Sequence, residues 1–101
     1  MKNITKDKLY LSKDYIKGVL LLGLQEGAFV DLIDEEGMVE GGSNDWFEIC
    51  FYVAEKCHIV NEDDDTWEWM TRERNKNDEK IFGNFISIIM ETLPEIGITL
   101  I

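Results

Sequence analysis

Two long stretches with apolar side chains at helical spacing place the strongest limits on what this chain can fold into. In residues 45–57 and again in residues 78–93, apolar side chains recur every three or four positions and form one stripe along a helix. The charges of the first stretch agree, because Asp45 and Glu48 lie in its first turn and Lys56 lies in its last, the order that the helix dipole favours. Two such helices in a chain of 101 residues predict a mainly helical fold.

A further helix is predicted before the first stretch. Ser12 is a good N-cap for an apolar helix over residues 13–25. Gly18 and Gly23 weaken this prediction, because glycine is a poor helix former. A buried strand over residues 19–24 is therefore the alternative.

Residues 25–36 are ambiguous. Their apolar side chains pair at i, i+4, which favours a helix ended by Gly37, yet residues 29–39 also match two short strands of a β-hairpin. We favour the helix. Its last turn would nevertheless carry three acidic residues where the helix dipole favours bases. These residues are Asp34, Glu35 and Glu36.

The pattern as a whole predicts a single globular domain over residues 1–101, built as a small bundle of four or five helices with a short strand or hairpin. An α+β fold is the alternative. A short helix is expected over residues 66–74, capped by Asp63 or Asp65. The β-branched tail, residues 95–101, is expected to dock on the core as a short strand or an extended segment.

The compartment is predicted from what the chain lacks. No apolar run approaches the roughly 20 residues that span a bilayer, and no signal-peptide pattern follows the first basic residues, so we expect a cytoplasmic protein with no membrane association.

Cys50 and Cys57 lie seven positions apart in one predicted helix, which separates them by about 10 Å along its axis. That distance is too long for a disulfide, so both are expected to be reduced thiols in the core.

The net charge of −11 is unevenly distributed along the chain. Residues 18–69 contain fourteen acidic residues against the single base Lys56, which gives this segment a net charge of −13. Such a surface repels nucleic acid and anionic lipid and attracts basic proteins. The composition therefore predicts a basic protein as partner and excludes direct nucleic-acid binding.

One stretch combines this charge with aromatic side chains. Within residues 62–69 there are five carboxylates and two tryptophans, and carboxylates beside an aromatic ring suit the capture of arginine or lysine side chains. If the stretch is helical, the two tryptophans point apart, so one can belong to the core while the other is exposed. A second acidic group, residues 34–36, is extended by Glu40, Asp45 and Glu48. The predicted partner-binding residues are Glu62, Asp63, Asp64, Asp65, Trp67, Glu68, Trp69, Asp34, Glu35 and Glu36.

Other chemistry finds little support. The acidic run lacks the glycine and the final glutamate that an EF-hand calcium loop needs at its sixth and twelfth positions. Glu55, Cys57 and His58 are too few to form a zinc or di-iron site. As neighbours, Cys57 and His58 do not face each other as a catalytic dyad would. We expect no enzyme activity, no metal and no other cofactor.

In size and acidity the chain resembles small bacterial immunity proteins and antitoxins that neutralise a basic nuclease. The resemblance is one of general character and involves no sequence motif, so it implies no fold and no site residue. It implies a stoichiometric inhibitor that covers the cationic active-site cleft of a nuclease toxin. The alternatives are a nucleic-acid mimic that occupies a DNA- or RNA-binding site, and an accessory subunit with no inhibitory role.

Overall fold

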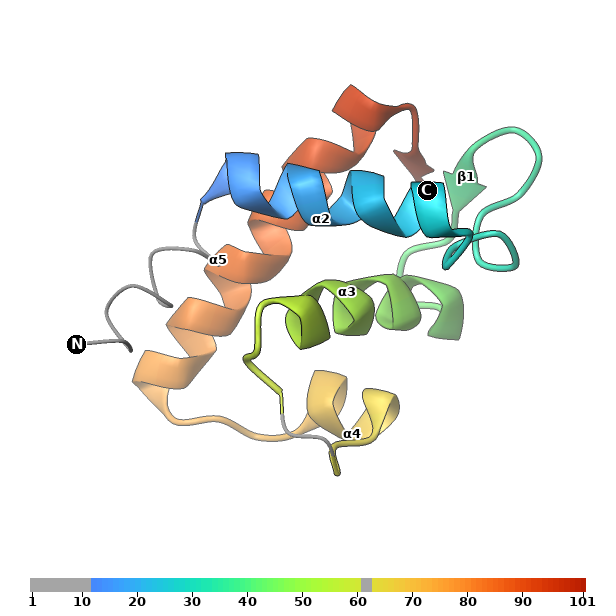
Figure 1. The fold of residues 1–101 in the computed structure, drawn as a ribbon. Helices are drawn as coiled ribbons and strands as arrows, with labels where there is room; N and C mark the ends of the chain where they lie inside the picture. The colour runs from blue at the N-terminus through green and yellow to red at the C-terminus, as the bar shows by residue number, and fades with distance from the viewer. Residues whose placement is uncertain (1–11, 61–62) are drawn as a thin grey trace.

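The computed structural model describes residues 12–60 and 63–101, and in these residues the fold is mainly helical, as predicted. The described residues form four α-helices followed by one 3₁₀ turn, and two very short strands that pair with each other (Figure 1). In chain order the elements are α2 (Lys13–Glu26), β1 (Met38–Val39), α3 (Asn44–Lys56), α4 (Thr66–Thr71), α5 (Lys76–Thr92), η1 (Leu93–Ile96) and β2 (Thr99–Leu100).

Each α-helix begins after a residue whose side-chain oxygen accepts a backbone N–H from the third residue along. These caps satisfy one of the N–H groups that a helix leaves without an internal partner. The predicted cap of α2 is confirmed, Asp65 is the cap of α4, and the helix forms instead of the alternative strand over residues 19–24. Helix α5 begins two residues earlier than predicted. The four caps are Ser12, Ser43, Asp65 and Asn75.

The prediction of a helix over residues 25–36 is wrong. Helix α2 ends at Glu26, and Gly27 adopts a left-handed conformation with φ of 79°. The chain then runs through successive turns to β1. One of these turns is held by the Asp34 carboxylate, which accepts the backbone N–H groups of Glu36 and Met38 at 2.9 Å each. A short acidic side chain that bonds its own backbone competes with a helix, and the acids at this point also oppose the dipole.

The alternative hairpin over residues 29–39 does not form either. Strand β1 pairs in parallel with β2 at the end of the described chain, and Met38 lies opposite Thr99. The predicted short strand in the tail is confirmed for Thr99–Leu100, whereas residues 95–96 belong to the 3₁₀ turn η1. The strands lie close together at Gly37, where an added Cβ would come within 2.7 Å of the Gly97 carbonyl oxygen. With φ of 82°, Gly37 occupies a position that suits glycine alone.

Helix α3 is the centre of the core. Figure 1 shows α2 on one side of α3 and α4 on the other, with α5 crossing α2. The residues of α3 that its neighbours bury are Trp46, Ile49, Cys50, Phe51, Val53 and Ala54. Among the described residues no helix is long and apolar enough to cross a membrane.

Substituting Gly23 in α2 tests this packing. A Cβ at Gly23 would come within 2.5 Å of the buried Phe29 ring, so Gly23→Ala should lower the free energy of unfolding by about 1–3 kcal/mol in urea denaturation. The matched control is Gly18→Ala in the same helix, where no described atom lies within 4 Å. That variant should gain up to about 1 kcal/mol from helix propensity. Equal stabilisation by both variants would contradict the packing.

Candidate protein-binding site

The acidic run leads directly into α4 and starts that helix. Asp65 caps it, and its carboxylate accepts the backbone N–H of Glu68 at 3.2 Å. Asp63 is exposed beside the cap, whereas Glu62 lies outside the described residues. Asp63, Asp64 and Asp65 therefore lie at a helix N-terminus, where negative charge is stabilised by the helix dipole.

The two tryptophans of α4 point in opposite directions, as expected for residues two apart on a helix. Trp69 is only 6% exposed and packs edge-on against Phe51 and Phe82, with ring centroids 5.9 and 5.1 Å away. Trp67 is 58% exposed and lies against Phe47, with ring centroids 5.6 Å apart. Trp69 thus belongs to the core, and Trp67 is the ring that α4 offers to a partner.

Arg72 neutralises part of the negative charge of the acidic run, and this pairing was not predicted from the sequence. One of its guanidinium nitrogens donates to Asp64 at 2.7 Å and to Glu68 at 2.6 Å. The hydrogen bond to Asp64, followed by that to Glu68, raises the pKa of Arg72 against the effect of burial. The Asp64 side chain is only 13% exposed, so it is engaged within the protein. The i, i+4 spacing of Glu68 and Arg72 is the signal that could have revealed this pair.

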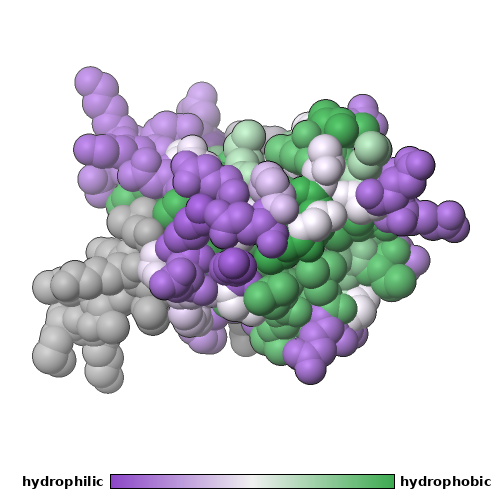
Figure 2. Space-filling model, turned by 90° about the horizontal axis from the view of Figure 1, so that it is seen from above, coloured by the Kyte–Doolittle hydropathy of each residue, from purple (hydrophilic) through white to green (hydrophobic). Residues whose placement is uncertain are grey.

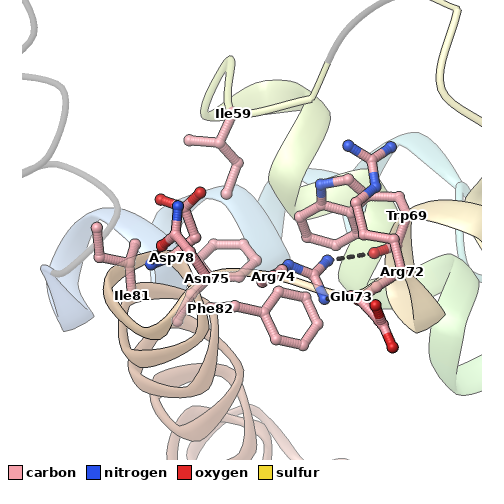
Figure 3. A pocket seen from close by; sticks show the side chains of 10 residues that line it. Ile59, Trp69, Arg72, Glu73, Arg74, Asn75, Asp78, Ile81 and Phe82 are labelled. Atoms are coloured by element: carbon pink, nitrogen blue, oxygen red, sulfur yellow. Dashed lines mark hydrogen bonds between the residues drawn. The ribbon is translucent and has the colours of Figure 1, made fainter.

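Arg74 holds the end of α4 to α5. Its guanidinium lies 3.6 Å from the centroid of the Phe82 ring and 5.4 Å from that of Trp69 (Figure 3). It also donates hydrogen bonds to the carbonyl oxygens of Trp69 and Arg72, and burial lowers its pKa. These groups line a hollow of about 550 Å³ between α4 and α5. A cation stacked on aromatic rings that also bonds carbonyls at a helix end stabilises the fold.

The second acidic group lies in the turn before β1, on the far side of α3 from α4 (Figure 1). Asp34 is engaged in that turn, while Glu35 and Glu36 are exposed. The two acidic groups do not adjoin, because the first turns of α3 lie between them. On the side of α4, Phe47 contacts Trp67, and the exposed acids Asp45 and Glu48 lie near Phe47 in the chain. On the other side, Asp45 shares a hollow of about 290 Å³ with Asp34.

The end of α3 carries the residues considered for metal binding or nucleophilic catalysis. Within residues 12–60 and 63–101, no three His, Cys, Asp or Glu side chains are grouped to hold a metal ion. Both cysteines are free thiols and buried. Burial raises the pKa of Cys50, and it raises that of Cys57 to about 11. A raised pKa disfavours the thiolate, which is the reactive form.

No protein family model matches the chain, and no curated protein or solved structure is found to be similar to it. What the protein binds has therefore to be inferred from its own residues.

Replacing each tryptophan of α4 by alanine should separate their roles. Trp67→Ala should change the free energy of unfolding by less than about 1 kcal/mol and remove the fluorescence that acrylamide quenches most readily, because this ring is largely exposed. Trp69→Ala should cost about 3–5 kcal/mol, because it empties a site in the core. Equal losses of stability would refute the assignment of Trp67 to the surface.

The thiols should be unreactive in the folded protein. At pH 8, iodoacetamide should modify neither Cys50 nor Cys57 until urea is added, after which mass spectrometry should find both alkylated. Since the pKa of Cys57 is raised to about 11, its reaction should keep accelerating as the pH rises from 8 and level off only near that value. The control is Cys57→Ser, which leaves Cys50 as the one thiol and so gives the rate at which Cys50 reacts by itself. Native labelling at the rate of free cysteine would contradict this prediction.

Proposed function

We propose that this protein is a noncatalytic, stoichiometric inhibitor that binds a basic protein and covers its cationic surface. The partner best suited to it is a nuclease toxin whose active-site cleft normally holds the phosphates of a nucleic acid. Carboxylates in place of phosphates block such a cleft without any chemistry by the inhibitor. This is the mode of action of small acidic immunity proteins.

One observation carries the proposal: in the described part of the chain, an exposed aromatic platform lies beside two carboxylates that pair with no lysine or arginine. Trp67 and Phe47 form the platform. Exposed Glu48 and Asp63 are close to it in the chain, and within the described residues no ion pair joins either of them to a lysine or arginine. An arginine of a partner can stack on such a ring and pair with a carboxylate at once.

The distribution of charge supports the same reading of the surface. The net −13 of residues 18–69 attracts a basic partner over a screening length of about 8 Å at physiological salt. Contact with Trp67 then determines how long the complex lasts, because exposed tryptophans are frequent hot spots at interfaces. Long-range attraction and short-range anchoring thus come from different residues of one surface.

A nucleic-acid mimic is the second candidate function. It is favoured by the succession of exposed acids from the turn before β1, through the start of α3, to the start of α4. A mimic of this kind would occupy a long phosphate-binding track on a host or defence protein, whereas an inhibitor of a toxin nuclease covers one catalytic cleft.

The experiment begins with co-purification from the native cell and identification of the bound protein by mass spectrometry. Nuclease activity of that partner should fall to zero at a 1:1 ratio. A large nucleic-acid-binding assembly without nuclease activity would instead favour the mimic. A partner with neither property would mean an accessory subunit and would overturn the proposal.

Two pairs of charge-removing substitutions then test the site. Glu48→Gln with Asp63→Asn should slow association by about tenfold at low salt and flatten its salt dependence. The control pair, Asp14→Asn with Glu91→Gln, removes as much charge from exposed positions on α2 and α5 and should slow association far less. Trp67→Ala should mainly speed dissociation, by about 2 kcal/mol or more. Equal effects of the two pairs would place the contact elsewhere.

A further inference from the structure

A second exposed surface, apolar rather than anionic, lies at the C-terminal end of α2. Four of the seven large apolar side chains that are exposed in the described residues fall within residues 21–30. Val30 is the most exposed at 74%, and Leu24 is 38% exposed. Figure 2, a view of the molecule from above, shows a broad hydrophobic region with hydrophilic residues at its edge. The four residues are Leu21, Leu22, Leu24 and Val30.

This area borders a groove of about 480 Å³ between the end of α2, the turns that follow it, and the segment from η1 to β2. Six of the side chains that line the groove are aliphatic or aromatic, and the other non-glycine residues are the acids Asp34 and Glu35. No lysine or arginine is among the described residues that line it. The apolar lining is made up of Leu24, Phe29, Val30, Ile33, Ile96 and Ile98.

The floor of the groove is packed against the core. Phe29 is 1% exposed and lies against Gly23, where no larger residue fits. Its ring makes an edge-on contact with Tyr52 at 5.0 Å between centroids, and the Tyr52 hydroxyl donates to the Glu26 carboxylate at 2.9 Å. Because these groups fix one another, the groove exists before anything binds, which lowers the entropic cost of binding.

We infer that the groove receives an amphipathic, basic helix of a partner protein. The apolar face of that helix would cover Leu24 and Val30, and its lysines or arginines would face the acids at the rim. Leu21 precedes Leu24 by one helical turn on the same side of α2, so it extends the apolar strip along which such a helix can lie. Charge complementarity selects this occupant, because the charged groups that line the groove among the described residues are all carboxylates.

Other occupants meet like charges. In a symmetric dimer the same patch faces itself, so Glu35 and Asp34 of one copy would oppose the same acids of the other. An anionic membrane surface would be repelled by the same residues. This surface lies on the opposite side of α3 from Trp67 and so goes beyond the proposed function.

The test uses a synthetic helical peptide of about 18 residues, five turns, with leucines at helical spacing on one face and lysines on the other. Isothermal titration calorimetry should detect binding to the full protein. Leu24→Ser with Val30→Ser should weaken it by about tenfold or more, and Glu35→Gln should weaken it by a smaller factor. The surface control is Met90→Ser, which changes a 46% exposed apolar side chain on α5 outside the groove. This variant should bind as the unchanged protein does.

The other results would overturn the inference. Loss of peptide binding in Trp67→Ala, with the groove variants unaffected, would place the peptide on the α4 surface. Equal binding of a peptide with glutamates in place of lysines would remove the role of the acidic rim. Dimerisation of the protein alone in analytical ultracentrifugation, abolished by the groove variants, would make a second copy the occupant.

Discussion

Burial of α3 by its neighbours is the constraint on which the rest of the molecule depends. Helix α4 has only six residues, far fewer than a helix needs to be stable in isolation, so tertiary contacts have to hold it. Those contacts come chiefly from Trp69, which packs against Phe51 of α3 and Phe82 of α5. Once Trp69 is turned inward, the helical repeat of about 100° per residue turns Trp67 outward. The exposed ring of the candidate site is thus a consequence of core packing.

The few bases of the chain determine which acids remain available to a partner. Arg72 is shared between Asp64 and Glu68, and Lys13 and Lys17 both pair with Glu95 at the other end of the molecule. Exposed pairs of this kind add little stability each. Their larger effect is on the surface, because they neutralise some acids, whereas the acids at the start of α3 and beside the α4 cap form no ion pair with any other described residue. The attraction for a basic partner is therefore concentrated there.

Periodicity in the sequence was enough to predict helices α3 and α5, because each has one apolar stripe, although α5 begins two residues earlier than predicted. It was not enough for residues 25–36, where the i, i+4 pairs favour a helix and the side chain of Asp34 forms a turn instead. The parallel pairing of β1 with β2 could not be predicted, since it joins segments about sixty residues apart. At the candidate site, the opposite directions of the tryptophans followed from helical geometry. Which of them is buried depended on Phe51 and Phe82, which only the fold brings together.

The groove beside α2 and the platform on α4 are held in fixed relation by α3, which packs against both helices. Neither surface is large, and a chain of this size has little room for an extensive interface. When a partner binds both surfaces through one chain, its second contact is intramolecular and raises the affinity of the complex. The effective concentration for that contact is set by the length of chain that joins the two binding elements of the partner. Because both surfaces are rigidly placed, that length has one best value. A small acidic domain can in this way bind more tightly and more selectively than either surface would allow alone.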